Sequence, residues 1–296
     1  RLAIQAGVSP MTAIQMATIN SAEAYRIDHL VGAIVPGRIA DVLFVDDLTQ
    51  FRVRAVMTNG KMVAEDHKLS YALHAPKRSA ALSSPLKCKP TTKADFEYHV
   101  ALENGTADVL ALDVKGPFVR KRRDVTLTVR NHIVQPDTEQ DVVLVGVLER
   151  FGRNGNRTLA FCSGWKLKRG AMASSAAPDD NNIVVMGVDA EDMSIAVNYL
   201  IEQGGGQVVV DGGKIMEFLP LPVGGIVSDC EPEEICAAEK KIDNAVRALG
   251  SDLPDPMMYM FFLPITSIPD YAVTDAGPVD YLALRHFDPI LALHAE

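Results

Sequence analysis

The chain has little positive charge, few aromatic side chains and no long apolar run. Its 296 residues include 29 Lys and Arg against 38 Asp and Glu, which gives a formal net charge of −9 at pH 7. Such a charge disfavours non-specific attraction to nucleic acid and to anionic lipid. No apolar run approaches the roughly 18 residues that a membrane span needs, and no basic and then apolar leader opens the sequence. We therefore expect a cytoplasmic protein that binds neither nucleic acid nor membrane.

Cysteine and histidine are present, but not in the spacings that build disulfide frameworks or metal sites. The seven histidines include no His-x-His and no pair four residues apart, the spacings that place two ligands on one face of a strand or a helix. A metal site built from this chain alone is therefore not expected. No Cys-x-x-Cys pair occurs either, so we expect free, buried thiols in a reducing compartment. These cysteines are Cys88, Cys162, Cys230 and Cys236.

The first 65 residues predict a short helix followed by small strands. Ser9 and Pro10 form an N-cap and a first-turn proline, and apolar residues then recur at helical spacing up to Ala22. Turn residues flank 33–35, and 41–46 is an apolar run closed by acidic residues, which predicts a hairpin whose second strand is buried. Asn-Gly at 59–60, between two alternating runs, predicts a second hairpin.

The second half of the sequence predicts many strands and two helices. One helix is expected from the N-cap Asp189 to Gly204, and the other from near Asp229 and Pro232 to Gly250. Strands interspersed with few helices indicate an α+β domain. The predicted strands cover residues 109–114, 125–129, 141–147, 158–161, 183–186, 207–210 and 215–219.

Two segments near the start carry a resemblance to a known superfamily. They are Met-Ala-Thr-Ile-Asn-Ser-Ala-Glu-Ala-Tyr at 16–25 and the stretch 32–46, which contains Pro-Gly-Arg-Ile-Ala-Asp before its apolar run. This order resembles the point where an amidohydrolase-superfamily enzyme leaves its last barrel helix and enters its small β-sandwich. The resemblance implies that the chain is the C-terminal part of a larger protein. We also expect 32–64 to leave an apolar face that the preceding part covers.

A narrower resemblance covers the second half. The motifs at 149–155, 167–175, 182–187, 219–229 and 253–256 follow one another as in the C-terminal domain of adenine deaminases. Together the resemblances imply a mixed α/β and β fold: the end of an amidohydrolase (β/α)8 barrel with a small β-sandwich, and then a C-terminal α+β domain. The implied divisions are barrel helix 1–28, sandwich portion 29–69, irregular linker 70–96 and α+β domain 97–296.

The resemblance also implies a chemistry. In the family, a divalent metal pair, Mn or Fe, lowers the pKa of a bound water, the hydroxide attacks C6 of adenine, and ammonia leaves. The metal ligands are implied to lie on barrel strands that precede this chain, so the chain alone is expected to be inactive. Adenine is the implied substrate, the missing barrel half is the implied partner, and the protein is expected to form a homo-oligomer.

The sequence departs from the family pattern in one loop. Where adenine deaminases commonly read Ala-His-Asp-Ser-His-Asn, residues 177–182 read Ala-Pro-Asp-Asp-Asn-Asn, and Phe151 stands where a histidine is often found. If those histidines line the purine pocket, adenine is in doubt as the substrate; if they are structural, nothing is lost. Two alternatives therefore stay open: a related amidohydrolase acting on another cyclic amine or amide, and a non-catalytic paralogue with a binding or assembly role. The residues expected to approach a ligand are Arg153, Asp179, Asn182 and Asp229.

Overall fold

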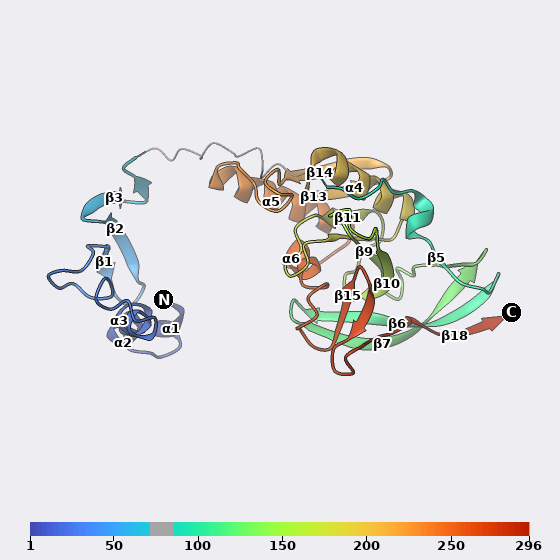
Figure 1. The fold of residues 1–296 in the computed structure, drawn as a ribbon, viewed down its shortest axis with the longest axis horizontal. Coiled ribbons are helices and arrows are strands. Elements are labelled where there is room, and N and C mark those ends of the chain that lie inside the picture. Colours follow the sequence, from blue (N-terminus) through green and yellow to red (C-terminus); the bar gives the residue numbers. More distant parts are fainter. Residues whose placement is uncertain (72–85, 296) are drawn as a thin grey trace. The chain divides into compact units, whose positions relative to one another are not determined.

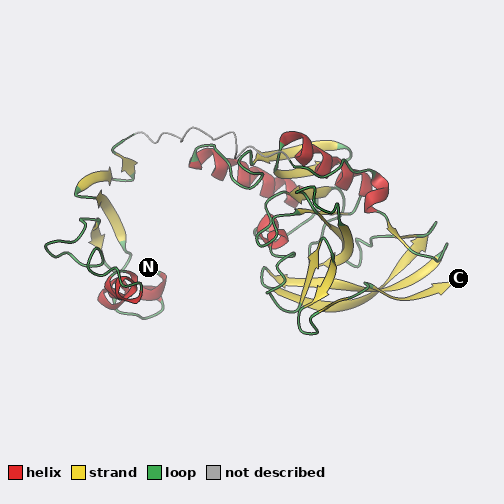
Figure 2. Cartoon of the chain, viewed as in Figure 1, coloured by secondary structure: helices red, strands yellow, loops and turns green. Residues whose placement is uncertain are grey.

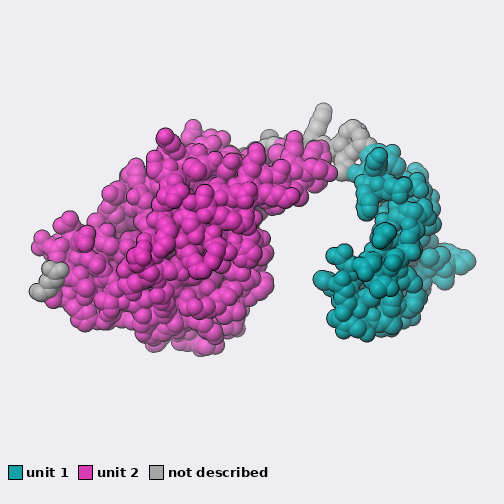
Figure 3. Space-filling model, turned by 180° about the vertical axis from the view of Figure 1, so that it is seen from behind, with its two compact units in different colours: residues 1–75 teal, residues 76–296 magenta. Residues whose placement is uncertain are grey.

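The structure is a computed structural model that describes residues 1–71 and 86–295. The chain divides into two compact units, Arg1–Ala75 and Pro76–Glu296, which Figure 3 shows in different colours. Much of the connection predicted at 70–96 lies outside the described residues. Within the described ranges, no helix is long and apolar enough to cross a membrane.

Unit 1 begins with three short helices: α1 (Leu2–Gln5), α2 (Pro10–Ala17) and α3 (Ile19–Ala24). Ser9 caps α2 as predicted, because its Oγ accepts a hydrogen bond from the N–H of Thr12 at 3.3 Å. The single helix expected up to Ala22 is instead divided at Thr18, whose φ of −127° and ψ of −94° are not helical. Thr18 Oγ1 donates to the carbonyl of Ile14 at 2.6 Å, and such side-chain bonds to the preceding turn compete with regular helix.

A four-stranded antiparallel sheet follows, in the order β1 (Val42–Asp47), β2 (Arg52–Thr58), β3 (Lys61–Glu65) and β4 (Lys68–Leu69). The hairpin predicted at Asn59 and Gly60 is confirmed, with φ of 49° and 72° at the two turn residues, as a tight two-residue turn requires. The strand predicted at 33–35 is wrong. The N–H of Val35 bonds to the carbonyl of Ala33 at 3.2 Å, so this segment turns where a strand would extend.

Unit 1 buries little apolar surface. Among its described residues only Ala22 and Ala55 are buried apolar residues, while Ile34 is 86% exposed. The prediction that the strand at 41–46 would be buried is wrong, since β1 contains no buried residue. Val42, Phe44 and Val56 are partly exposed as well, so the described residues of unit 1 do not bury them completely; that a preceding part covers this face stays a prediction. Among residues 1–71, β1 is an edge strand that pairs only with β2.

Unit 2 is built on one mixed sheet of 11 strands (Figure 1). All seven strands predicted for this half coincide with observed strands, and strands make up most of its regular structure (Figure 2). In spatial order the strands are β14 (Lys214–Pro220), β13 (Gly206–Asp211), β11 (Ala171–Ser174), β12 (Ile183–Gly187), β9 (Val142–Leu148), β10 (Arg157–Ser163), β6 (Gly105–Gly116), β7 (Val119–Arg130), β8 (Ile133–Val134) and β5 (Tyr98–His99). The eleventh, β18 (Ile290–Ala295), pairs with β6.

Both faces of this sheet are covered, so the unit has three layers. One face packs against α4 (Ala190–Gln203) and the 3-10 helix η2 (Lys93–Phe96). The other packs against helices and a small sheet: α5 (Pro232–Ala248), α6 (Pro256–Phe261), β15 (Tyr271–Thr274), β16 (Gly277–Asp280) and β17 (Arg285–His286). Successive residues of β9 alternate between the two cores, with Val143 and Val145 facing one and Val142 and Leu144 facing the other.

The two predicted helices of this half are α4 and α5. Asp189 caps α4 by accepting from the N–H groups of Glu191 and Asp192, and Gly204 ends the helix with a left-handed φ of 77°. The cap of α5 is Glu231, which forms a capping box with Glu234, two residues beyond the predicted Asp229.

Residues 86–96 were expected to belong to the irregular linker, yet they pack onto unit 2. The Phe96 side chain is 1% exposed in the core beneath α4. The N–H of Thr91 donates to Asn198 Oδ1 on α4 at 2.7 Å, and Asn198 Nδ2 returns a bond to the Thr91 carbonyl at 2.8 Å.

All four cysteines are free, as predicted, but the prediction that they are all buried is wrong. Cys162 is buried in the core of unit 2, and burial raises the pKa of its thiol. Cys88 is partly buried, whereas Cys230 and Cys236 are exposed around the start of α5, where that helix carries few core contacts.

Candidate functional site

Several loops that carry distinctive motifs of unit 2 leave the large sheet at the same end. Leu148, the last residue of β9, pairs with Arg157 at the start of β10 and with Ile183 at the start of β12. Ser174, the last residue of β11, likewise pairs with Gln207 near the start of β13. Antiparallel pairing therefore brings the loops 149–156 and 175–182 and the turn at 204–205 together, and we call this region the sheet end.

Glu149 shapes the first of these loops. Its carboxylate is 5% exposed and accepts hydrogen bonds from the N–H groups of Phe151 at 2.6 Å, Arg153 at 3.0 Å and Gly155 at 3.3 Å. Burial acts to raise the pKa of Glu149, but these backbone donors outweigh it and hold the pKa below its usual range. The ionised carboxylate thus fixes the backbone of the loop around itself.

The ring of Phe151 lies between two guanidinium groups. The Cζ atom of Arg150 is 5.0 Å from the ring centroid, and that of Arg153 is 5.3 Å from it. Both distances are within the range of cation–π attraction. Arg153 is exposed whereas Arg150 is only 4% exposed, so the same ring has a solvated cation and a buried one beside it.

A second polar cluster joins the loop before β12 to the turn between β15 and β16. Asn182 is 4% exposed, and its Nδ2 donates to Asp180 Oδ2 at 3.1 Å and to Asp275 Oδ1 at 3.2 Å. Asn156 Nδ2 donates to the second oxygen of Asp275 at 3.3 Å. Asn182 Oδ1 is buried and finds no donor among the described residues.

The two carboxylates of this cluster repel one another. Burial raises the pKa of Asp180, and the negative charges of Asp275 and Asp179 raise it further, against the hydrogen bonds from Asn182 that lower it. A carboxyl group with such a pKa can hold a proton nearer neutral pH than a solvated aspartate does. The cluster therefore offers one neutral acceptor, Asn182 Oδ1, beside a carboxyl group suited to proton exchange.

The structure brings together some of the ligand residues expected from the sequence. Arg153 and Asn182 lie in neighbouring loops at the sheet end, and the exposed Asp179 lies in the same loop as Asn182, with a left-handed φ of 85°. Asp229 is exposed on the stretch that leads into α5. Asp275 was missed, because it is 93 residues from the Asn182 that it contacts and no local pattern indicates it.

The loop in which histidines are replaced is a tight turn. The N–H of Asn181 donates to the carbonyl of Ala177 at 2.7 Å, and Asn181 has a left-handed φ of 52°. Pro178 is exposed at the outside of this turn. Pro178 is thus open to solvent, whereas Asn181 is partly buried, and neither side chain belongs to the two cores of unit 2.

Metal binding finds no support in the described part of the chain. No group of three or more His, Cys, Asp or Glu side chains there could hold a metal ion. Asp180 and Asp275 are two carboxylates whose oxygens already accept from amide groups, so the residues present do not fit the metal pair that the family implies.

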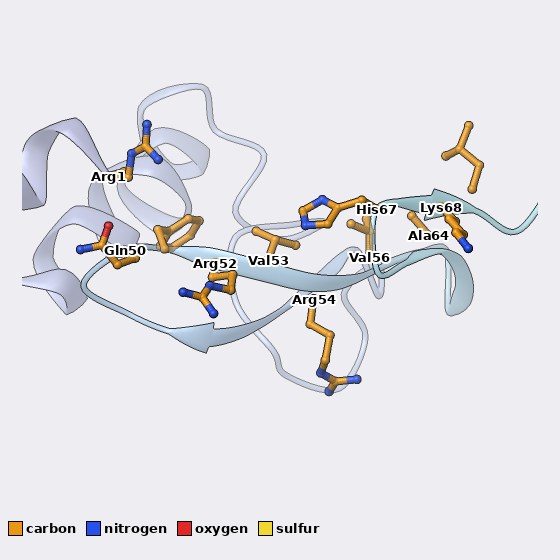
Figure 4. A pocket seen from close by; sticks show the side chains of 11 residues that line it. Arg1, Gln50, Arg52, Val53, Arg54, Val56, Ala64, His67 and Lys68 are labelled. Atoms are coloured by element: carbon orange, nitrogen blue, oxygen red, sulfur yellow. The ribbon is translucent and has the colours of Figure 1, made fainter.

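Unit 1 contains a hollow of about 730 Å³ beside β2, drawn in Figure 4. Among the residues that the structure describes, its lining includes cationic and apolar side chains but neither a carboxylate nor a thiol. Arg54 points away from His67 across the strand and pairs with Asp46 at 3.1 Å. The hollow thus lacks a partner that would make His67 an acid–base pair or a metal site.

Two known families match the chain, one in each of its two units. Residues 1–63 match the amidohydrolase family, and residues 117–284 match the adenine deaminase C-terminal domain. These ranges correspond to the helices of unit 1 with most of its small sheet, and to most of unit 2, including the whole sheet end.

Similar proteins cover almost the whole chain. "Adenine deaminase 1" of Desulfotalea psychrophila is 71% identical over 294 residues, which are 99% of this chain and 50% of that protein. "Adenine deaminase 1" of Latilactobacillus sakei is 56% identical over 99% of this chain and 49% of its own length, and "Adenine deaminase 4" of Rhizobium meliloti is 53% identical over 98% and 49%. The chain thus spans about half the length of the curated relatives that it matches. Residues 117–284, which match the adenine deaminase C-terminal domain, make up more than half of the chain. The chain therefore belongs to the adenine deaminase C-terminal domain family.

Proposed function

We propose that this chain is the C-terminal part of a longer adenine deaminase, which hydrolyses adenine to hypoxanthine and ammonia. The observation that carries the proposal is the match of nearly the whole chain, at 53 to 71% identity, to three relatives that bear this name and are about twice its length. The metal, Mn or Fe, would supply an activated water in the preceding half. No residue described in this chain is assigned to hold it.

The exposed apolar residues of unit 1 support a larger parent protein. Leu2 is 79% exposed, Tyr25 80% and Ile34 86%, and exposed apolar side chains of this kind are typical of a surface that another part of a protein covers. In our proposal the preceding half covers these side chains and completes the sandwich. Unit 2, with its two packed cores, needs no such cover.

In the proposed enzyme the sheet end contributes binding groups and not the metal. Asn182 Oδ1, which lacks a donor among the described residues, would accept a hydrogen bond from the amino group of the purine. Asp180, whose pKa burial raises, would hold or release a proton beside it. Arg153 and Asp179 would lie on the solvent side of the bound purine. Asp229, in the stretch before α5, would be a further residue that approaches it.

The replaced histidines favour one further candidate, a related hydrolase that acts on another cyclic amine or amide. Pro178 and Asn181 remove two ionisable groups from the loop next to Asn182. If that loop borders the substrate, the enzyme would deaminate adenine slowly.

Kinetics of the longer protein with metal restored would test both the proposed deamination of adenine and the proposed role of the loop 177–182. We expect weak adenine deamination that rises at least tenfold in kcat/KM when Pro178→His and Asn181→His are introduced together, because a general acid or base typically contributes about a hundredfold or more. Lys214→His is the matched control, since this exposed residue lies in the β13–β14 hairpin at the other end of the sheet. No detectable deamination in any variant would contradict the proposed function, whereas an unchanged kcat/KM in a folded double variant would contradict only the role of the loop.

A further inference from the structure

Arg150 is a buried cation without a matching acceptor. Its side chain is 4% exposed, and its Nε and Nη1 atoms find no hydrogen-bond acceptor within residues 1–71 and 86–295. Burial lowers its pKa, and the charges of Cys88 and Asp180 oppose that effect. An unpaired buried guanidinium is costly, so a chain retains one rarely unless something binds it.

Arg120 shows how the same fold treats a structural arginine. It is 1% exposed, and its guanidinium donates to the carbonyl groups of Phe262, Leu263, Ile265 and Ile268. Two nitrogens of that side chain therefore serve four acceptors. Within residues 1–71 and 86–295, Arg150 Nε and Nη1 have no such acceptor, although Arg150 is buried almost as deeply.

The segment that covers the Arg150 guanidinium is backbone without a packed side chain. A Cβ atom added to Gly225 would lie 2.3 Å from Arg150 Nη1, so only glycine leaves room for the guanidinium there. The neighbouring Ile226 and Val227 are 39% and 55% exposed. Hydrogen bonds hold the segment: Ser175 Oγ donates to the Gly225 carbonyl at 2.6 Å. A cover held by few polar contacts and flanked by exposed side chains can open at low cost.

The charges around the guanidinium favour an anion. Arg153 shares the Phe151 ring with Arg150, and Lys87 lies against Gly152 in the same loop. Glu149, the nearest carboxylate in the sequence, is already occupied by three backbone N–H groups. Asp180 is the acidic residue whose charge acts on Arg150, and its own acceptors are used by Asn182.

We propose that Arg150 is an oxyanion-binding residue, which takes the carboxylate or phosphate group of a small anion beneath the Gly225 segment. A planar guanidinium donates two parallel hydrogen bonds to such a group, which a lysine cannot do. This site neighbours the proposed purine contact but uses other atoms: Arg150 Nη1 lies against Gly225, whereas Asn182 contacts the β15–β16 turn, and the charge of Asp180 acts on the first and its carboxylate bonds the second.

Thermal unfolding of this chain tests the proposal, with the fluorescence of Trp165 as the signal. This residue is the single tryptophan and is completely buried in unit 2, so it reports on that unit. Inorganic phosphate and acetate are titrated separately at constant ionic strength. We expect one or both to raise Tm by about 3 °C at tenfold above Kd, and Arg150→Gln to abolish the rise. A response to phosphate alone assigns the site to phosphate esters, and a response to acetate alone assigns it to carboxylates.

Two further variants separate binding from a structural role. Arg169→Gln removes an exposed arginine that pairs with Asp211, and we expect it to keep the response to anions. Without anion, Arg150→Gln should leave Tm unchanged or raise it, whereas Arg120→Gln should lower Tm by several degrees. Failure of both anions to shift the wild-type Tm, or a loss of Tm in anion-free Arg150→Gln as large as that of Arg120→Gln, would overturn the proposal.

Discussion

Buried charges at single residues are the least predictable part of this molecule. Arg120, Glu149 and Arg150 are each 5% exposed or less, and nothing in the spacing of the sequence separates them from solvated neighbours. Their environments differ because their partners come from distant segments or from backbone groups. A buried charge is stabilising only where such partners exist, so its role follows from the fold and not from its type.

Arg120 should contribute strongly to the stability of unit 2. Its guanidinium joins β7 to four carbonyl groups around the end of α6, and burial lowers its pKa to about 10, so it stays charged at neutral pH. Arg120→Gln leaves several of these acceptors unpaired, which should lower the free energy of unfolding by about 3 kcal/mol. Urea denaturation followed by Trp165 fluorescence measures this loss. A loss below about 1 kcal/mol would show that the carbonyl groups find other donors.

A second prediction concerns Asp180. Burial raises the folded-state pKa of this residue above its unfolded value of about 3.9. Between those two values the folded state binds more protons, so the Asp180 contribution to stability falls as pH rises through the folded pKa. Asp180→Asn should remove this fall, and the stability of the variant relative to wild type should therefore increase with pH from about 4 upward and then level off. Glu202→Gln, at an exposed residue of α4, is the control; parallel curves for Asp180→Asn and wild type would contradict the assignment.

At the scale of elements, the strands and caps of unit 2 follow from local sequence. The Asp189 and Gly204 caps bound α4 where predicted, and the β-branched runs of β9, β12 and β13 are strands. β11 was not predicted because Ala-Met-Ala-Ser has no strand preference and pairs only because β12 and β13 lie on both sides of it.

Other elements were missed or misplaced for reasons of context. The start of α6 has a local signal, since Asp255 is its N-cap and Pro256 stands in its first turn. The sequence therefore contained an indication of this short helix. The strand expected at 33–35 failed because apolar character alone does not provide a pairing partner. The sheet end could be placed only in part: the loops carry recognisable motifs, but the contact between Asn182 and Asp275 depends on how the small β15–β16 hairpin packs.

The loop 149–156 provides a prediction for an element. Glu149 fixes it through three backbone donors, and its lowered pKa means that this contribution is present above the unfolded pKa and is lost as pH falls through the folded value. Glu149→Gln should speed hydrogen exchange of the amides of Phe151, Arg153 and Gly155 by about tenfold at neutral pH, since a charge-assisted acceptor is replaced by a neutral one. Glu202→Gln on the exposed face of α4 is the matched control. Equal exchange rates in Glu149→Gln and wild type would show that the loop is held by other contacts.

At the scale of the whole molecule, the two units differ in how complete they are. Unit 2 has a buried core on each face of its sheet, whereas unit 1 buries two alanines and exposes large apolar side chains. The relatives that match the chain have about as many residues again. In the proposed enzyme, the preceding half therefore carries the metal chemistry, and the sheet end of unit 2 contributes some of the substrate contacts.

The most direct measurement is ammonia release from adenine by two proteins: this chain alone, and the chain joined to the part of the Desulfotalea psychrophila relative that it does not match. Elemental analysis of both preparations accompanies the assay. We expect neither bound transition metal nor ammonia release for the chain alone, and both for the joined protein after growth with Mn or Fe. About one metal per molecule and adenine turnover in the chain alone, or a folded, metal-loaded joined protein that releases no ammonia, would contradict this expectation.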